Sequence, residues 1–333
     1  MKRKCSLKTL VVLPLAFVLG VAVVGIKFAQ ADEKINYRLK WLFNMSVAGD
    51  LYADEQGLFA QYGLDVAVKA GGPERDAIKE LELGYAQFGV ASADQVIRAR
   101  DKGAAVVVIA QLFQINPLQW IYRANELKLE TLNDLKGKTI GITYGGNDET
   151  IMRTLLAKAG IKDDQVNLFS VRYDYTPFYQ RKVDLWPVYI NSQGIFVSQK
   201  LRDAGETVGF FDPVAFGVKF VANSVVTSEK MIAEEPAIVG RFIKALLAGW
   251  RQAFDPANRK RTIETVKQFD KDTAVDVLEA QYDITRRLVQ SDPSVVIGSI
   301  DVDAWRQTEE IMLTQKVITK PVKVTEYLKS MAR

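Results

Sequence analysis

The sequence predicts an α/β protein of two lobes, each a mostly parallel sheet flanked by helices, with a ligand cleft between the lobes. From residue 35 onward, short apolar strands alternate with amphipathic helices, which is the rhythm of βαβ units in a sheet covered on both faces. A return strand within 215–232 follows a second run of such units, so we expect the chain to cross between the lobes twice. With 333 residues, 48% of them hydrophobic, the chain can bury two cores.

The first lobe is expected to begin with four strands, a small-residue helix at 48–53 and two further helices. The strands are expected at 35–39, 64–71, 86–92 and 104–113, and the two further helices at 74–84 and 93–103. The last strand, AAVVVIAQLF, is continuously apolar and rich in β-branched residues, as is typical of a strand buried on both faces. Gly84 and Gly103 end the two helices.

The second lobe repeats this alternation from about residue 127, and a helical region follows the return strand. Crossings near 119–123 and 216–221 give the expected boundaries. Lobe one is then discontinuous and lobe two is inserted in it; the ranges are 32–122 and 219–333 for lobe one and 123–218 for lobe two. Two crossings make a hinge, and closure of the lobes around a ligand is the usual use of that geometry.

The first 31 residues are expected to be a signal peptide rather than part of the fold. A basic stretch, MKRKCSLKT, precedes an apolar run at 10–26, and the small residues Ala29 and Ala31 suit cleavage after Ala31. An uncleaved membrane anchor is the alternative, but Pro14 and Gly20 interrupt the run, which is short for a span. Export predicts a periplasmic protein.

The basic charge of the chain lies in this leader. The sequence has 44 Lys and Arg against 40 Asp and Glu, and residues 1–31 hold five of the basic residues and no acid. Without the leader, 39 basic and 40 acidic residues remain, so no nucleic-acid partner is expected. The basic cluster at 258–271 is expected to be a solvated helix face.

Histidine is absent, and the single cysteine, Cys5, lies in the leader. The mature chain therefore has no disulfide, no thiolate or imidazole metal ligand, and no cysteine or histidine for nucleophilic or general-base chemistry. These exclusions weigh against most hydrolases and metalloenzymes. They favour a binding protein without a metal or cofactor.

Four segments carry a resemblance to a known family. They are LKWLFNMSVAGDLYADEQGLFAQYGLDVAVKAGGP, AQFGVASADQVIRARDKGAAVVVIAQLFQINP, LKGKTIGITYGGNDETIMRTLLAKAG and FIKALLAGWRQAF. They are similar to periplasmic substrate-binding proteins of ABC transporters that share a domain with alkanesulfonate-, pyrimidine- and riboflavin-binding proteins. The resemblance covers roughly residues 35–320. It implies a monomeric two-lobe type II periplasmic binding protein that delivers a small molecule to a membrane permease with a cytoplasmic ATPase.

Within this family, KWLFN, KAGGP and DLWPVYIN resemble the branch that binds thiamine-precursor pyrimidines and includes the eukaryotic thiamine pyrimidine synthases. The resemblance implies a thiamine-related pyrimidine as ligand, with a flavin or another aromatic compound as the second choice. In the synthases a histidine supplies ring atoms and a cysteine-rich motif is present. This chain has neither, so the synthase stays an alternative. A ligand-sensing module presented to a membrane partner is a third hypothesis.

Aromatic residues at predicted strand ends are the candidates for stacking on a planar ligand. Trp41 follows the first strand, Tyr144 precedes two glycines, and Trp186 and Tyr189 flank Pro187. Offset stacking on such rings contributes about 1 kcal/mol beyond burial. Packing in the core is the alternative for each of them.

Four polar residues are the candidates for hydrogen bonds to a heterocycle. They are Asp50, Asn116, Glu149 and Asn191. The loop TYGGNDET at 143–150 bears on the charge of the ligand, because amides at a helix N-terminus suit an anion. However, Asp148 and Glu149 occupy the first turn and would repel a sulfonate or phosphate. A plain N-cap role is the alternative for Asn147 or Asp148. This favours an uncharged heterocycle over an alkanesulfonate or nitrate.

Overall fold

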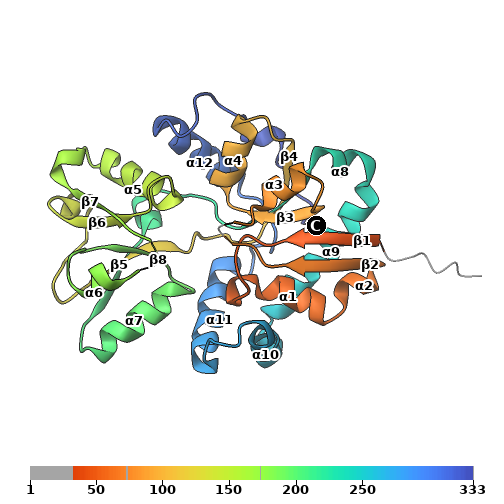
Figure 1. Cartoon of the computed structure of the whole chain (residues 1–333), viewed down its shortest axis with the longest axis horizontal. Helices are drawn as coiled ribbons and strands as arrows, with labels where there is room; N and C mark the ends of the chain where they lie inside the picture. Colours follow the sequence, from red (N-terminus) through yellow and green to blue (C-terminus); the bar gives the residue numbers. More distant parts are fainter. Residues whose placement is uncertain (1–32, 73, 173, 333) are drawn as a thin grey trace, which may run out of the picture. The chain divides into compact units, whose positions relative to one another are not determined.

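The computed structural model describes residues 33–72, 74–172 and 174–332, so the signal peptide predicted over 1–31 lies outside the described residues. The described chain forms two α/β lobes (Figure 1). Lobe one contains a five-stranded sheet in the order β2-β1-β3-β10-β4. Its strands are β1 (Glu33–Arg38), β2 (Leu64–Lys69), β3 (Phe88–Ala91), β4 (Val106–Gln111) and β10 (Ser224–Ser228).

Helices from both ends of the chain surround this sheet. They are α1 (Ala48–Glu55), α2 (Leu58–Gln61), α3 (Ala77–Glu82), α4 (Ala93–Asp101), α8 (Glu229–Glu234), α9 (Pro236–Ala253), α10 (Arg259–Phe269), α11 (Val275–Val289) and α12 (Val302–Thr314), with the 3-10 helices η1 (Met45–Val47), η5 (Pro256–Asn258) and η6 (Val324–Glu326). Among the described residues, no helix is both long and apolar enough to cross a membrane.

Lobe two is drawn from yellow to green in Figure 1. It contains β5 (Leu118–Arg123), β6 (Thr139–Ile142), β7 (Asn167–Ser170), β8 (Trp186–Tyr189) and β9 (Val208–Phe211), with α5 (Asn147–Lys158), α6 (Thr176–Tyr179), α7 (Gln193–Asp203), η2 (Leu132–Leu135), η3 (Asp163–Gln165) and η4 (Pro213–Phe216). Its strands pair as β8-β5-β9 and β6-β7, and a parallel bridge between Ile140 and Leu185 connects the two groups.

Each lobe has one strand that runs against the others. β10 is antiparallel to β3 and β4, and β5 is antiparallel to β8 and β9, whereas β1 pairs in parallel with β2 and β3. These two strands are the ones the chain enters directly after crossing from the other lobe. A strand that starts at the cleft must run away from it, while the strands that follow a helix run toward it. Most strands of each lobe therefore run in one direction, as predicted, but the pairing is mixed, because half of the pairings in the sheet of lobe one and both pairings in β8-β5-β9 are antiparallel.

The first crossing lies earlier than the sequence analysis placed it. Residues up to 122 were assigned to lobe one, but β5 pairs with β8 and β9 in the sheet of lobe two. The crossing is therefore the segment 112–117, and the return runs through 217–223. The two segments are tied together, because Leu112 N donates to Asn223 O at 2.9 Å and Asn116 Nδ2 donates to Phe220 O at 2.7 Å.

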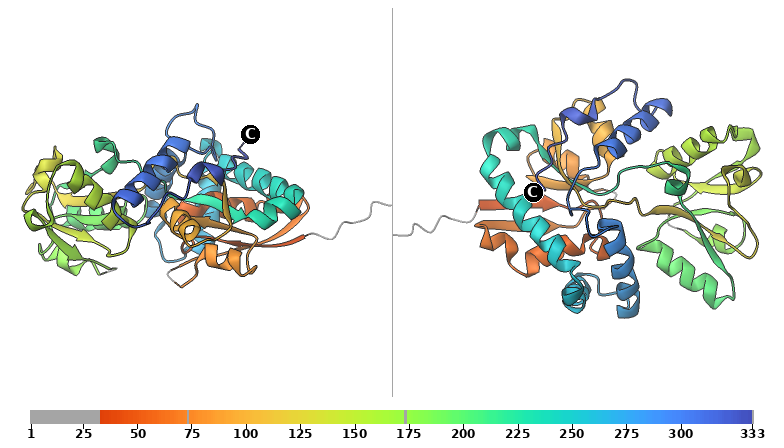
Figure 2. Two further views of the ribbon diagram at one scale, coloured as in Figure 1. Left: turned by 90° about the horizontal axis from the view of Figure 1, so that it is seen from above. Right: turned by 180° about the vertical axis from the view of Figure 1, so that it is seen from behind.

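Helix α9 covers one face of the sheet of lobe one (Figure 2). Its Phe242 ring stacks on Phe88, with 3.7 Å between the ring centroids, and meets the edge of Tyr37 at 5.1 Å. Small residues let α9 approach α1 closely. A Cβ atom added at Gly249 would lie 2.7 Å from the carbonyl oxygen of Gly49. This contact fixes α1, and with it the segment between β1 and α1.

Candidate functional site

A cavity of about 490 Å³ lies between the lobes, a volume that suits a small molecule. Its lining comes from both lobes and consists of Lys40, Trp41, Asn44, Ser46, Val47, Ser92, Asp94, Gln95, Arg98, Phe113, Gly145, Gly146, Asn147, Tyr189, Ser192, Gln193 and Asn223. Most of these residues follow the carboxyl ends of β1, β3, β4, β6 and β8 or begin the helices after them, while Arg98 lies in the second turn of α4 and Asn223 directly precedes the antiparallel strand β10. Ligands of open α/β sheets bind at this edge, because the loops and helix N-termini of neighbouring strands meet there.

The segment after β1 is held in place by a glycine. Gly71 N donates to the carbonyl oxygen of Trp41 at 2.9 Å. A Cβ atom at Gly71 would lie only 2.1 Å from the carbonyl oxygen of Leu39, so the two backbones can approach only because residue 71 is glycine. The loop 70–72 thus fixes the position from which Trp41 reaches the cavity.

Aromatic rings from the two lobes line the same cavity. Trp41 belongs to lobe one and is half-buried, and Tyr189 belongs to lobe two and is also half-buried. The hydroxyl of Tyr189 accepts a hydrogen bond from Asn147 Nδ2 at 3.4 Å, and Lys40 Nζ lies 6.0 Å from the centroid of the Tyr189 ring. A third ring, Phe113, is buried in the first crossing.

The α4 helix brings charged and amide side chains to the cavity. Ser92 Oγ donates to Asp94 Oδ1 at 2.5 Å, and Gln95 Oε1 accepts from Ser92 N at 3.1 Å, which caps the helix. One turn later, Arg98 Nη2 donates across the cleft to the carbonyl oxygen of Gly145 at 3.3 Å. Lobe one therefore contacts the loop between β6 and α5 through this guanidinium.

Of the eight residues that the sequence analysis singled out, Trp41 and Tyr189 line the cavity. Tyr144 lies next to the lining residue Gly145 and is 56% exposed, so it stands at the cavity edge. The carboxylate of Glu149 is engaged by groups of its own loop and helix. Its Oε2 accepts from Gly145 N at 2.7 Å, and its Oε1 pairs with Arg153 Nε at 2.9 Å.

The structure places Trp186 and Asp50 in the cores, which corrects their assignment to the ligand site. Side chains alternate along a strand, so Trp186 lies on the face of β8 opposite Tyr189 and packs against Phe178, with 6.1 Å between the ring centroids. Asp50 is fully buried under α9. Its Oδ1 accepts from Tyr37 Oη at 2.6 Å and from Trp250 Nε1 at 3.3 Å.

The two asparagines on the list hold the backbone and the lobes instead of lining the cavity. Asn116 Oδ1 accepts from Leu118 N at 2.9 Å, while its Nδ2 binds the return segment. Asn191 is buried, and its Nδ2 donates to Ser46 Oγ and to Thr285 Oγ1, both at 3.0 Å. Asn191 is therefore buried behind Tyr189 and Ser192, which form the cavity wall.

The acidic first turn of α5 points back into the loop that precedes it. Asp148 is buried, and its Oδ2 accepts from Thr143 N at 2.7 Å. Burial raises the pKa of Asp148 to about 6, against the opposing effect of this hydrogen bond. Asp148 thus holds the loop 143–146 but is not the N-cap of α5, which is Gly146 without a side-chain cap, and neither Asp148 nor Glu149 lines the cavity.

Several lining residues were missed by sequence reasoning, among them Lys40, Asn44, Arg98, Asn147 and Gln193. A positional signal was available for them. Each lies within a few residues after a predicted strand or in the first turns of the following helix. Selection by chemical type favoured rings, carboxylates and two other asparagines, and it included neither these amides nor any cation.

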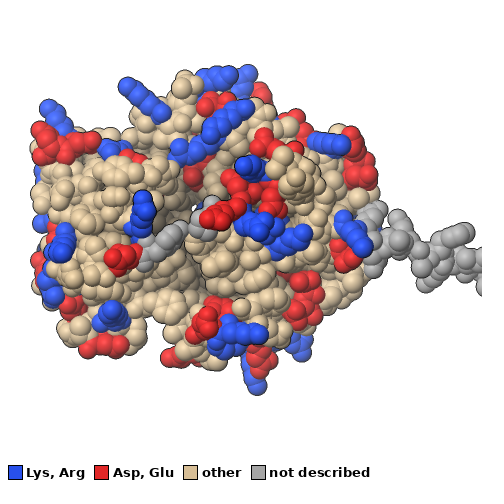
Figure 3. Space-filling view, viewed as in Figure 1, with Lys and Arg blue, Asp and Glu red and all other residues tan. Residues whose placement is uncertain are grey.

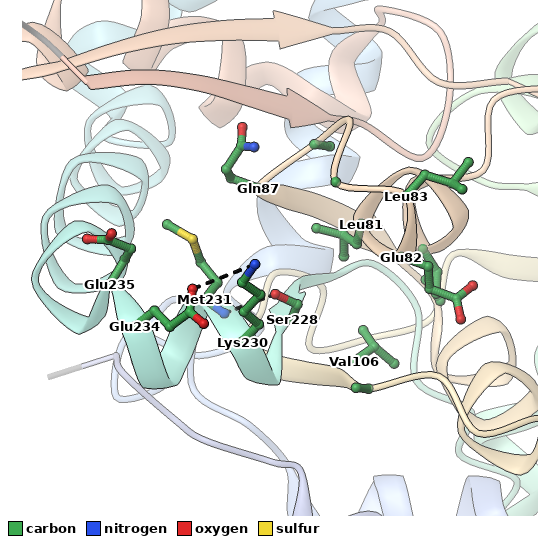
Figure 4. Close-up of a pocket in the computed structure, with 14 residues that line it drawn as sticks. Leu81, Glu82, Leu83, Gln87, Val106, Ser228, Lys230, Met231, Glu234 and Glu235 are labelled. Atoms are coloured by element: carbon green, nitrogen blue, oxygen red, sulfur yellow. Dashed lines mark hydrogen bonds and ion pairs between the residues drawn. The ribbon is translucent and has the colours of Figure 1, made fainter.

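A larger cavity, of about 670 Å³, lies in lobe one between α3 and α8 (Figure 4). Gln87 precedes β3, Val106 begins β4 and Ser228 ends β10, so this cavity lies at the amino ends of the parallel strands. Of the charged groups there, Lys230 Nζ pairs with Glu234 Oε2 at 3.7 Å. This is the edge of the sheet opposite to the one where ligands of such folds bind.

Charge is evenly mixed on the face shown in Figure 3, where basic and acidic side chains are interspersed over the described residues. The described residues contain no group of three or more His, Cys, Asp or Glu side chains that could hold a metal ion. The cavity between the lobes, with its rings, amides and two cations, is therefore the candidate site for a small organic molecule.

Comparison with known proteins places this geometry in a family. The sequence model of the family described as NMT1/THI5 like matches residues 44–259. The riboflavin-binding protein RibY of Chloroflexus aurantiacus is 24% identical over 88% of this chain and 84% of its own length. The formylaminopyrimidine-binding protein of Halalkalibacterium halodurans is also 24% identical, over 88% of both chains.

Solved structures show the same fold. The periplasmic aliphatic sulphonate binding protein SsuA of Escherichia coli covers 89% of this chain and 97% of its own with a TM-score of 0.72 at 16% identity. The desulfurization enzyme DSZB covers 90% of this chain and 96% of its own with a TM-score of 0.59 at 12% identity. The predicted two-lobe periplasmic binding protein fold is thus confirmed, and the chain belongs to the NMT1/THI5-like family.

Proposed function

We propose that this protein is the solute-binding component of an ABC importer, and that it captures a small planar heterocycle between its lobes. One observation carries the proposal. Trp41 of lobe one and Tyr189 of lobe two line a single cavity of about 490 Å³, so a flat ring placed there meets an aromatic side chain from each lobe. Binding would then favour the arrangement in which the two lobes are close.

Side-chain amides around these rings supply the polar contacts. The lining includes Asn44, Gln95, Asn147, Gln193 and Asn223. An amide group offers both donors and an acceptor, which matches the mixed pattern of ring nitrogens and amino or keto groups of a heterocycle. The relative from Chloroflexus is named for binding riboflavin and the relative from Halalkalibacterium for binding formylaminopyrimidine, and both names support this ligand class. A thiamine-related pyrimidine is our first choice.

A binding role without chemistry agrees with the residues present. The sequence has no histidine, and its single cysteine is Cys5. The lining holds neither, so a synthase-like or desulfurization-like reaction would need other groups at the cavity. We further propose export by a leader cleaved after Ala31 and release of the ligand to a membrane permease. The intact mass of protein recovered from the periplasm tests the cleavage.

A thermal-shift titration tests the proposed function. The mature protein is titrated with hydroxymethyl-aminopyrimidine, thiamine, riboflavin, taurine and nitrate. Stabilisation by a ring compound that grows with the logarithm of its concentration supports the proposal. Stabilisation by taurine or nitrate alone contradicts it. Mass analysis of a stabilising compound after incubation shows whether it is returned unchanged, and its conversion would point to the enzyme alternative.

A further inference from the structure

We propose that the ligand carries an anionic group beside its ring, such as a phosphate or carboxylate, and that Lys40 and Arg98 bind this group. The inference rests on the proposed function, because it concerns the same cavity. It gives the ligand a negative charge, whereas the sequence favoured an uncharged heterocycle.

Two cations line the cavity without a carboxylate partner. In the described part of the chain, Lys40 forms no ion pair and lies near the Tyr189 ring, and Arg98 contacts the backbone oxygen of Gly145. Both side chains are half-buried. A cation that has lost part of its water is stabilised by an opposite charge, so each of these groups favours an anion in the cavity.

Other partly buried arginines of this protein show the usual arrangement. Arg38 Nε pairs with Glu80 at 2.8 Å, and Arg153 Nε pairs with Glu149 at 2.9 Å. Arg123, which is almost fully buried, pairs with Glu206. These three cations are neutralised within the chain. At Lys40 and Arg98 the chain supplies no such carboxylate among the described residues, which leaves that role to a ligand.

The nearby carboxylates offset this positive charge only in part, because the lining holds one carboxylate against two cations. Asp94 is the one acidic residue in the lining, and it accepts a hydrogen bond from Ser92 Oγ. Asp148 and Glu149 bind the amides of Thr143 and Gly145 and lie outside the lining. The carboxylates of Asp148 and Glu149 therefore face their own loop, and these hydrogen bonds weaken the repulsion that they would exert on an anionic ligand.

The helix that begins at Gln193 adds to the same field. Ser192 and Gln193 line the cavity, and the first turn of α7 contains no acidic residue. The amide groups of this turn carry a partial positive charge that no side chain of the turn offsets. This helix contribution is secondary, and the inference rests mainly on the side-chain cations of Lys40 and Arg98.

Matched ligand pairs test the inference by calorimetric titration of the mature protein. The pairs are riboflavin with riboflavin 5′-phosphate, and hydroxymethyl-aminopyrimidine with its phosphate ester. Each pair keeps the ring and differs by the phosphate group. We expect the ester to bind at least tenfold more tightly for the ring that fits, because hydrogen bonds to charged groups are among the strong ones. Added salt should reduce this advantage, since it screens the attraction.

Substitution of Lys40 identifies the group responsible. Lys40→Gln should lower the affinity for the ester by about tenfold and reduce its advantage over the neutral ring compound. Lys128→Gln removes a lysine whose side chain is 81% exposed in lobe two, and it should leave the advantage intact. Arg98→Gln provides a second variant, and equal melting temperatures of the unliganded variants exclude misfolding.

The outcomes separate the inference from the proposed function. If the neutral compound binds as tightly as its ester, or if Lys40→Gln weakens both alike, the anionic ligand is wrong while the solute-binding function stands. If no ring compound binds in either form, the proposed function fails and the inference fails with it. If taurine binds more tightly than every ring ester, the requirement for a ring is wrong.

Discussion

Asn191 Nδ2 lies 3.0 Å from Thr285 Oγ1, and this hydrogen bond joins lobe two to helix α11 of lobe one. The same nitrogen donates to Ser46 Oγ, a residue of the cavity lining. Tyr189, Ser192 and Gln193 line the ligand cavity, whereas Ile190 and Gly194 line a separate groove between α7 and α11. Asn191 therefore hydrogen-bonds the two lobes together within the wall that separates the ligand cavity from this groove.

Asn191→Ala should loosen the contact between the lobes. The change removes both donated hydrogen bonds and leaves the buried hydroxyl of Thr285 without this donor, at a cost of about 1–3 kcal/mol in the free energy of unfolding. We expect faster amide exchange in 44–47 and 189–193 and a larger radius of gyration by X-ray scattering without ligand. Asn133→Ala, at an exposed position in lobe two, is the control. Equal exchange rates in the two variants would show that Asn191 does not tie the lobes.

Asp50 should make the protein less stable as the pH rises from about 5 to 8. Burial raises the pKa of Asp50 from 3.8 to about 7, while hydrogen bonds from Tyr37 and Trp250 oppose the shift. Between these values the folded state holds a proton that the unfolded state has lost, so folding is most favoured on the acid side and loses that advantage as the pH approaches 7. Burial also raises the pKa values of Asp54 and Asp148, which act in the same direction.

Urea unfolding at pH 5, 6, 7 and 8 measures this effect. The free energy of unfolding should fall over this range, and Asp50→Asn should flatten the slope because the amide does not titrate. Asp272→Asn, at an exposed position, should keep the slope of the parent protein. A shallower slope should remain from Asp54 and Asp148. A slope in Asp50→Asn as steep as that of the parent protein would assign the pH dependence to groups other than Asp50.

Gly249→Ala should destabilise the protein by about 1–3 kcal/mol, because the added methyl group would overpack the contact between α9 and α1. A Cβ atom at this position would lie 2.5 Å from Ala53 Cβ. Gly240→Ala in the same helix is the matched control, since nothing lies within 4 Å of its Cβ position. That change should stabilise the helix by about 0.5–1 kcal/mol. Thermal unfolding of both variants compares them, and opposite signs are the expected result.

The sequence was sufficient for most of the local elements and for the two-lobe arrangement, but it did not show β5 and β9 as strands. A continuous apolar run rich in β-branched residues identified the strand at 104–113, observed as β4 (Val106–Gln111), because this signal lies within a few neighbouring residues. The position of the first crossing was missed. The local sequence does not show to which lobe β5 belongs, because only its pairing with β8 and β9 places it in lobe two.

The site could be predicted in part. Trp41 and Tyr189 follow strand ends, and the positions of strand ends could be read from the sequence. Trp186 looked equivalent to Tyr189, but a strand presents alternate residues to opposite faces, and the sequence did not show which face was the core. Asp50 and Asn191 engage partners that are distant in the chain, and local patterns carry no information on such contacts.

The most direct test of the central claim is calorimetric titration of the ring compound that stabilises the parent protein best, performed on the parent and on Trp41→Ala. Loss of the ring removes a stacking partner and apolar contact area, so we expect the affinity to fall by at least tenfold. Tyr85→Ala, which removes a ring that is 65% exposed, should leave the affinity unchanged. An unchanged affinity in a folded Trp41→Ala protein would contradict the account, because the ligand would then bind somewhere other than between Trp41 and Tyr189.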